Sequence, residues 1–418
     1  MEKIPNLRHL RAFREVVRQN SVSLASQQVY LSQPAITQAI AKLEEMLGVS
    51  LFERRNDGMY ATEPGLLFHE RVDRALAHIQ TGAREALRSG SKKGGGRGFA
   101  NFDQLLTAAQ LRALTAISGA GNFSLAARTA GISQPALHRA ARDLERLAGV
   151  ALFVKTGHGI ELTRAAQTLA QHAKLAFAEL EQGFEEVAGW LGLDTAVIAV
   201  GTMPLPRSFL LPSAVNSLMR TNPDVRVSIV DGPYDDLLHA LRHGEIDLLV
   251  GALRDPVPIE DVVQEPLFQD PLTVVVRAGH PLARQRVVRV SDLIDYPWVL
   301  PRRGAPTREL FEEAFGGVKH LNRNGLIEAS SLILIRELLC GSNRLTFISG
   351  HQVRHEQSLG LLSVLNVDMP LVERPIGVTV RRDWRPTATQ ERFLTLLRKA
   401  GQSLDHTRID QPAFLFEN

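Results

Sequence analysis

A short polar pattern near the N-terminus contains residue types that can recognise nucleic acid. Ser32-Gln33-Pro34-Ala35 is followed by Thr37 and Gln38, and then by Arg54 and Arg55. A glutamine can form two hydrogen bonds with an adenine edge, and a threonine can contact a phosphate or a thymine methyl group. Nearby arginines can pair with backbone phosphates. The pattern therefore predicts DNA contact, provided that one element presents these side chains together.

The same pattern recurs 101 residues later as Ser133-Gln134-Pro135-Ala136 (133 − 32 = 101). The same offset pairs Ser23-Leu24-Ala25 with Ser124-Leu125-Ala126, and Thr62 with Thr163, without a gap. So long a shared register indicates a duplication. The predicted DNA contacts are Ser32, Gln33, Pro34, Thr37, Gln38, Arg54 and Arg55 in copy one, and Ser133, Gln134, His138, Arg139 and Lys155 in copy two.

Each copy is predicted to fold as three helices and a hairpin. Apolar residues at helical spacing predict first helices at about 7–18 and 109–118. Ser23 and Ser124 are candidate N-caps of short second helices, and the serine of each Ser-Gln-Pro-Ala caps a third. A Leu-Phe pair and a glycine-containing turn then predict a hairpin wing. This is the layout of a winged helix-turn-helix, whose third helix enters the major groove.

Ser-Gln-Pro-Ala followed by Leu-Glu, Gly-Val-x-Leu-Phe and Thr resembles the N-terminal signature of LysR-type transcriptional regulators. The resemblance covers nearly the whole chain, but such regulators carry one winged helix domain and this sequence carries two. Copy two has His138 where copy one has Thr37, and Ala166 where copy one has Gly65. Which copy reads DNA stays open, and copy two could instead be a spacer or a protein contact.

The basic excess is confined to the N-terminal quarter of the chain. Residues 1–98 hold 15 Lys and Arg against 10 Asp and Glu, a net charge of +5. Residues 99–192 hold 8 against 8, and residues 193–418 hold 25 against 27. This distribution favours copy one as the part that meets a polyanion.

A helix with one apolar face is predicted after each wing, within 65–98 and 166–193. In the resembled family this linker helix dimerises, which implies a homodimer or homotetramer joined through 166–193. Packing of the two helices within one chain is the alternative. Between the copies, residues 89–98 form a Gly-rich, Lys-containing linker that is predicted to be flexible.

From Thr195 onward, apolar strands alternate with helices, which predicts a parallel sheet with helices on both faces. This half resembles the LysR effector domain, which has a type 2 periplasmic-binding-protein fold. The resemblance implies two subdomains that clamp a small-molecule effector, with crossovers near 270 and 373. Ligands on such sheets bind beyond strand ends and near helix N-termini, which favours an organic anion. The candidate effector contacts are Thr202, Met203, Gly251, Arg302, Arg303, Ser330 and Ser349.

The predicted fold class is α plus α/β, with two winged helix-turn-helix domains, linker helices and a two-subdomain effector domain. The predicted segments are 1–64 (copy one), 65–98 (linker helix and basic linker), 99–165 (copy two), 166–193 (linker and dimerisation helix), 194–404 (effector domain) and 405–418 (tail). The partners expected for such a regulator are double-stranded DNA, an effector, further copies of the chain and RNA polymerase.

Other function classes are less well supported by the residues. The sequence has no phosphate-binding glycine loop after a strand, no metal-spaced His/Cys cluster and no Gly-x-Ser-x-Gly motif, so no catalytic residue, metal or cofactor is predicted. A transport-type binding protein would explain only the C-terminal half, and the charged N-terminal stretch, which lacks an apolar region, predicts no secretory signal. The single cysteine, Cys340, suits a reducing cytoplasm, and its apolar neighbours predict a buried thiol.

Overall fold

A computed structural model describes residues 4–90, 99, 101–120, 122–157, 159–193, 195–317 and 324–405. The chain divides into two compact units, the N-terminal unit (Met1–Ala196 with His243–Glu245) and the C-terminal unit (Val197–Arg242 with Ile246–Asn418). Residues 91–98 of the predicted flexible linker, and the tail beyond residue 405, lie outside the described residues.

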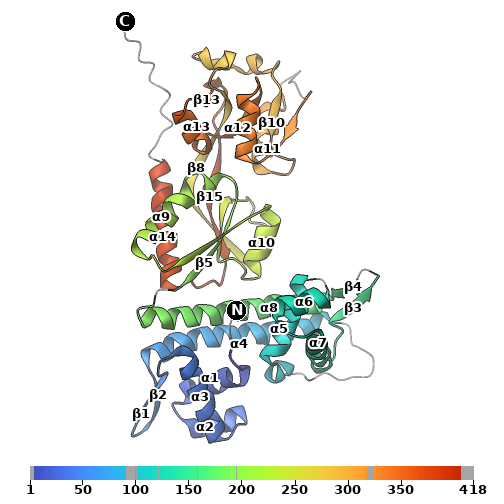
Figure 1. Cartoon of the computed structure of the whole chain (residues 1–418), viewed down its shortest axis with the longest axis vertical. Helices are drawn as coiled ribbons and strands as arrows, with labels where there is room; N and C mark the ends of the chain where they lie inside the picture. The colour runs from blue at the N-terminus through green and yellow to red at the C-terminus, as the bar shows by residue number, and fades with distance from the viewer. Residues whose placement is uncertain are drawn as a thin grey trace. The chain divides into compact units, whose positions relative to one another are not determined.

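Both copies of the repeat form three helices followed by an antiparallel hairpin (Figure 1). Copy one contains α1 (Leu7–Gln19), α2 (Val22–Val29), α3 (Gln33–Leu47), β1 (Phe52–Arg55) and β2 (Gly58–Ala61). Copy two contains α5 (Ala108–Ala120), α6 (Phe123–Ala130), α7 (Gln134–Ala148), β3 (Phe153–Thr156) and β4 (Gly159–Leu162). The apolar stripe of each third helix is buried, with Ile36 and Leu137 fully inaccessible. The polar residues of α3 and α7 are therefore turned outward.

The start of each third helix matches its predicted cap. Ser32 and Ser133 each accept a hydrogen bond from the amide three residues later, at 3.4 Å. The second helices begin earlier than predicted. Ser21 and Asn122 accept from the amides three residues on, at 3.3 Å and 2.7 Å, so the caps proposed at Ser23 and Ser124 are wrong. A short polar side chain at either place can satisfy the free amides of the first turn, and here the earlier one does.

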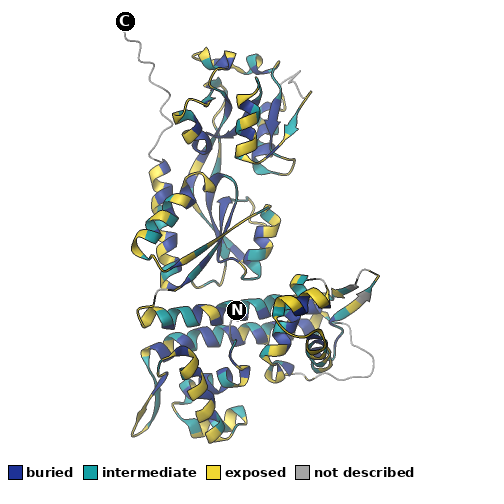
Figure 2. Ribbon diagram, in the orientation of Figure 1, coloured by how far each residue is buried: buried dark blue, intermediate teal, exposed yellow. Residues whose placement is uncertain are grey.

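Two long helices, α4 (Glu63–Ser89) and α8 (Arg164–Trp190), form the centre of the N-terminal unit. They pack antiparallel, because Phe68 contacts Phe184 (ring centroids 5.5 Å apart) while His78, further along α4, contacts His172 (5.8 Å). Their facing sides are buried (Figure 2). Gly82 allows this close approach, since a Cβ there would lie 2.6 Å from Cβ of His172.

A buried arginine on α4 connects the two helices. Arg71 is 1% exposed, and its Nη1 donates to Oε2 of Glu179 at 2.9 Å and to Oε1 of Gln182 at 2.8 Å. Its Nε donates to Oε2 of Glu186 at 3.0 Å. Arg74, one turn further along α4, also donates to Glu179, at 2.7 Å. Burial alone would raise the pKa of the Glu179 carboxyl, but Arg74 and Arg71 outweigh it and hold that pKa below its usual range.

In this structure, residues 166–193 pair with a helix of the same chain. The apolar face of α8 is buried against α4 of the same chain, with Leu180 at 2% and Val187 at 0% exposure. The same face cannot simultaneously hold another α8. Packing within one chain, the alternative to dimerisation, is thus the arrangement of this structure, and dimerisation through 166–193, which stays a prediction, would have to use another face of α8.

The C-terminal unit contains a mixed sheet in the order β11-β10-β12-β8-β15-β7-β5-β6, with β13 paired to β8. Its strands are β5 (Val197–Thr202), β6 (Arg226–Asp231), β7 (Leu248–Ala252), β8 (Val262–Arg277), β10 (Trp298–Leu300), β11 (Ile327–Glu328), β12 (Leu345–Ser349), β13 (Leu362–Val364) and β15 (Val372–Arg381). The prediction of a parallel sheet is wrong for β8 and β15, which pair antiparallel with each other and with β7 and β12.

These two long strands pass through both halves of the C-terminal unit. One core gathers around Ile198 and Val378, beside α9 (Leu210–Thr221) and α14 (Ala388–Asp405). Another gathers around Trp298, beside α11 (Pro306–Phe315). Asp270 and Arg374, near the two predicted crossovers, are register partners between the cores.

The remaining helices of this unit are α10 (Tyr234–Arg242), α12 (Leu332–Cys340) and α13 (Arg354–Ser358). Cys340, predicted to be buried, is exposed at the end of α12. Leu339, next to it, is the buried residue of that turn, so the apolar run is only partly covered.

Replacing Arg71 with Met should destabilise the N-terminal unit, because Glu179 and Glu186 lose a buried counter-charge. Removing one partner of a buried ion pair costs roughly 3–5 kcal/mol. Hydrogen exchange of the full chain, followed at the amides of α4 and α8, would measure the loss. Arg74→Met is the matched control, since Arg74 is 27% exposed and should contribute about 1 kcal/mol or less.

The difference between these variants should depend on pH. Folding depresses the pKa of Glu179, so its stabilisation is present above the ordinary carboxyl pKa and is lost as pH falls through the folded value. The loss of stability caused by Arg71→Met should therefore be smaller in acid. Equal protection of α4 and α8 in both variants at neutral pH would contradict this account.

Candidate nucleic-acid interface and ligand cavity

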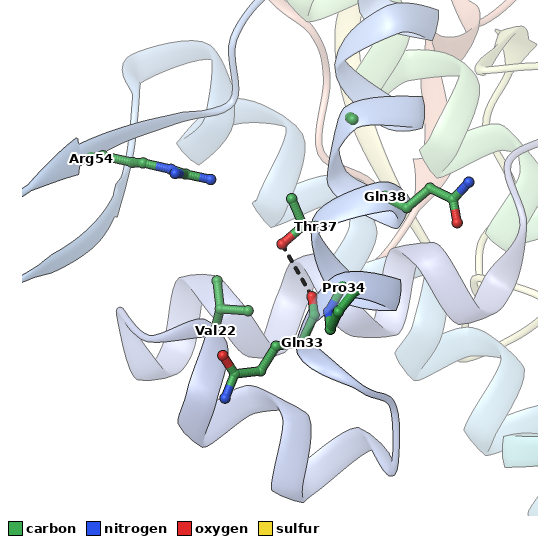
Figure 3. A pocket seen from close by; sticks show the side chains of 7 residues that line it. Val22, Gln33, Pro34, Thr37, Gln38 and Arg54 are labelled. Carbon is green, nitrogen blue, oxygen red and sulfur yellow. Dashed lines mark hydrogen bonds between the residues drawn. The ribbon is translucent and has the colours of Figure 1, made fainter.

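The exposed side of α3 forms one wall of an open hollow in copy one. Thr37, Gln38 and Ala41 line it from α3, Val22 from α2, and Arg54 from the wing strand β1 (Figure 3). Gln33 and Pro34 complete the lining. The structure thus brings together the polar residues that the sequence pattern singled out, with Ser32 as the cap beneath them.

Hydrogen bonds show which side chains of the hollow are already bonded within the protein and which are available to an external group. Gln33 Nε2 donates to Ser23 Oγ at 3.3 Å, and Thr37 Oγ1 donates to the carbonyl of Gln33 at 3.1 Å. The first bond ties α3 to α2, and the second satisfies Thr37 within its own helix. Among the described residues, Gln38 and Arg54 have no side-chain hydrogen bond or ion pair. These two are therefore free to bind an external group.

The second wing arginine is differently placed. Arg55 forms an ion pair with Glu53, and its guanidinium lies 4.9 Å from the ring centroid of Tyr60. The Tyr60 hydroxyl donates to Asp57 Oδ2 at 2.9 Å. Arg55 is thus partly neutralised and held along the hairpin. Arg54 is the stronger candidate for a phosphate contact.

Copy two has an aromatic pair at the corresponding positions. His138 stacks on Phe123, with ring centroids 3.8 Å apart and planes 10° from parallel. By the repeat offset these residues replace Thr37 and Val22 (138 − 101 = 37; 123 − 101 = 22). One face of the His138 ring is therefore covered. The tie between helices persists, since Ser124 Oγ donates to Gln134 Oε1 at 3.4 Å.

The third helix of copy two carries exposed cations instead. Arg139 takes the position of Gln38, and Arg142 takes the position of Ala41 (142 − 101 = 41). Both are exposed, and neither has a side-chain hydrogen bond or ion pair in the part of the chain that the structure describes. Sequence reasoning missed Arg142, although its spacing of three from Arg139 places both on one helix face. Lys155 lies on β3, but its side chain is outside the described residues.

A small cavity of about 100 Å³ lies within the C-terminal unit. Met203 and Ser330, two predicted effector contacts, line it. Residues that the sequence reasoning missed also line it, including Thr307, Gln352 and Arg374. Its walls thus combine a cation and several hydroxyl or amide groups with apolar surface, as small-molecule sites do.

The other predicted effector contacts are placed elsewhere. Thr202 is fully buried, and its hydroxyl donates to the carbonyl of Met203 at 3.1 Å. Gly251 does not line the cavity but packs against Met203, which does; a Cβ at Gly251 would lie 2.5 Å from Sδ of Met203. Arg302 and Arg303 are exposed and do not line the cavity. Ser349 is buried and donates to Asp270.

Arg374 connects the cavity to this buried acid. Its Nε donates to Asp270 Oδ2 at 3.1 Å, and its Nη1 donates to Thr307. Burial raises the pKa of Asp270, although Arg374 and Ser349 oppose the shift. The only sequence signal for Asp270 and Arg374 was their nearness to the expected crossovers. Among the described residues, no group of three or more His, Cys, Asp or Glu could hold a metal ion.

Models of known families match both halves of the chain. The helix-turn-helix model of the bacterial lysR family matches residues 7–66 and 108–167, and the LysR substrate binding domain matches residues 192–402. In the described part of the chain, no helix is long and apolar enough to cross a membrane.

Two relatives illustrate the similarity in sequence. The transcriptional regulator GalR of Pseudomonas putida is 33% identical over 379 residues, which cover 91% of this chain and 93% of GalR. PcaQ of Agrobacterium fabrum is 28% identical over 304 residues, covering 72% of this chain and 97% of PcaQ. The GalR match is too long to leave out either copy of the repeat, whereas the PcaQ match is short enough to leave out one.

Two solved structures share the fold. A full-length OxyR variant from Pseudomonas aeruginosa has a TM-score of 0.52 at 23% identity, covering 71% of this chain and 95% of OxyR. CbnR in complex with its target DNA has a TM-score of 0.50 at 19% identity, covering 70% of this chain and 98% of CbnR. Together with both family models and the GalR relative, the fold leads to one conclusion: this chain belongs to the LysR family of transcriptional regulators, a family of regulators and not of enzymes.

Proposed function

We propose that this regulator reads a specific DNA sequence with α3 of copy one and responds to a small organic anion bound in the C-terminal unit. The observation that carries the DNA part is the hollow of copy one, where Gln38 and Arg54 are exposed and uncommitted. A free amide on the third helix suits a base edge, and a free guanidinium on the wing suits a phosphate.

Copy two is proposed to contact DNA through a more basic surface, which reads a second half-site less strictly than copy one reads the first. Arg139 and Arg142 present two guanidiniums where copy one presents an amide and a methyl group. The His138 ring is stacked on Phe123, which limits its reach toward a base. Phosphate contacts position a protein, while base contacts specify the sequence. Copy two as the principal reader is the competing possibility, and comparison of Gln38→Ala with Arg139→Ala decides between them.

The organic-anion proposal rests on the surroundings of the small cavity. Pro306 and Thr307 form the first turn of α11, and Ser330 immediately precedes the N-cap of α12. Helix N-termini favour negative charge, and Arg374 adds a guanidinium, although Asp270 already pairs with it. A volume of about 100 Å³ favours a small acid.

The regulator would act in the cytoplasm on double-stranded DNA and influence RNA polymerase at a promoter. Further copies of the chain would join through surfaces other than the face of α8 that α4 covers.

Replacing Gln38 with Ala should reduce discrimination between the selected operator and its single-base variants by about 1–3 kcal/mol, because a base-reading amide is lost. Arg139→Ala is the matched change in copy two and should weaken operator binding with a smaller loss of discrimination, confined to the half-site of copy two. Binding titrations against an operator obtained by mapping bound genomic DNA would compare them. If Arg139→Ala loses discrimination and Gln38→Ala does not, copy two is the reader.

Replacing Arg54 with Ala should weaken binding to every DNA sequence and reduce the slope of log affinity against log salt by about one unit. The neighbouring Arg55→Ala should have a smaller effect, since Arg55 is paired with Glu53. Titrations at several salt concentrations measure both slopes. An unchanged slope for Arg54→Ala would remove this residue from the interface.

Small organic acids should raise the thermal stability of the full chain, since a ligand that binds only the folded state stabilises it by mass action. Ser330→Ala should reduce this shift, because it removes a hydroxyl from the cavity wall. Arg302→Ala, outside the cavity, is the control and should keep the full shift. A screen in which only neutral or cationic compounds stabilise the protein would refute the choice of an anion.

A further inference from the structure

We infer that one chain of this protein reads DNA with two heads, copy one and copy two of the repeat, and that its operator consists of two unlike half-sites. The inference rests on the proposed DNA binding and goes further by specifying the symmetry of the DNA partner. It follows from how α4 and α8 pair, and from how the two third helices differ.

The pairing of α4 with α8 has the geometry of a symmetric dimer made within one chain. Gly82 of α4 packs on His172 of α8, and Gly183 of α8 packs on Arg71 of α4, where a Cβ would lie 3.0 Å from Cβ of Arg71. The repeat offset converts one contact into the other (82 + 101 = 183; 71 + 101 = 172). The two helices therefore present equivalent faces to each other about an approximate twofold axis.

This geometry places the two heads at opposite ends of the helix pair (Figure 1). Each copy of the repeat precedes its own long helix, and the helices run antiparallel. Each long helix has 27 residues, which corresponds to a length of about 40 Å. Half-sites on one face of DNA lie roughly 34–36 Å apart. The helix pair therefore has the length needed to present both heads to neighbouring turns of one duplex.

The charges at the interface favour pairing of α4 with α8 over pairing of either helix with another copy of itself. Arg71 of α4 faces Glu179, Gln182 and Glu186 of α8. Subtracting the offset gives the groups that Arg71 would face if α4 paired with another α4: His78, Thr81 and Glu85. In that arrangement the buried guanidinium would have one carboxylate instead of two.

Pairing of α8 with another α8 is less favourable still. Each Glu179 and Glu186 would then face His172 instead of Arg71. His172 contacts Glu85 across the helix pair at 3.4 Å, but burial lowers its pKa and so favours the neutral ring. Each helix would then hold a buried Glu179 and a half-buried Glu186 without a permanent cation, which is unfavourable. Copy one is therefore matched to copy two and not to itself.

The matched heads carry different reading surfaces. Copy one presents Thr37, Gln38 and Ala41. Copy two presents His138, Arg139 and Arg142 at the equivalent positions. A symmetric dimer has two identical recognition helices, so its operator is a palindrome. The recognition helices α3 and α7 differ, and the pairing of α4 with α8 holds them in one chain. They cannot both fit best on identical half-sites. The operator unit should accordingly be asymmetric.

Selection from a random duplex library with the full-length chain tests this. The expected result is two different half-site motifs with centres about one helical turn apart, and scrambling either motif should weaken binding about tenfold or more. A palindrome of identical half-sites would overturn the inference while leaving the proposed DNA binding intact. Failure to enrich any sequence would overturn the proposed function, and the inference with it.

Exchanging residue types between the heads sharpens the test. A variant with Thr37→His, Gln38→Arg and Ala41→Arg should select a changed motif in one half-site only. The reciprocal variant, with His138→Thr, Arg139→Gln and Arg142→Ala, should change only the other half-site. Arg302→Ala in the C-terminal unit is the control and should select the wild-type motif. If either exchange alters both half-sites, or only the copy-one exchange has any effect, the inference is wrong.

Discussion

The buried guanidinium of Arg71 is the constraint on which the N-terminal unit depends. A cation that is 1% exposed must have its charge balanced locally, and Glu179 and Glu186 provide this balance from α8. The arginine sits where glycine at position 183 allows the helix backbones to approach closely. Register, partner and orientation of the two long helices are thereby fixed together, and each three-helix copy takes its place from the helix that follows it.

Local structure in both copies could be predicted from the sequence, because it depends on short-range signals. The apolar stripe through Ile36 and Leu43, the Ser32 cap and the glycine-containing turn each act within a few residues. The cap of α2 was misplaced by two residues, because Ser21 and Ser23 offer nearly the same chemistry. The partner of α8 could not be read from periodicity, because an apolar stripe shows that a face is covered and not what covers it.

The cavity was predicted less well, for a similar reason. Strand ends suggested Thr202 and Ser349, but their hydroxyls are used inside the protein, by the Met203 carbonyl and by Asp270. Arg374 comes from the long strand β15, about 100 residues along the chain from the Asp270 that pairs with it. Contacts over such a separation depend on the register of β8 and β15, and sequence patterns alone did not reveal even their antiparallel direction.

If both copies read DNA, as proposed, carrying them on one polypeptide changes how the regulator behaves as its abundance varies. Heads on separate chains must first associate, so the fraction of protein that can bind both half-sites falls on dilution. Heads joined by α4 and α8 meet at an effective local concentration set by the chain itself. Occupancy of such a site should then rise in simple proportion at low expression, because pairing of the two copies sets no concentration threshold. A mutation in one head is also not duplicated in the other, which leaves each copy free to evolve independently.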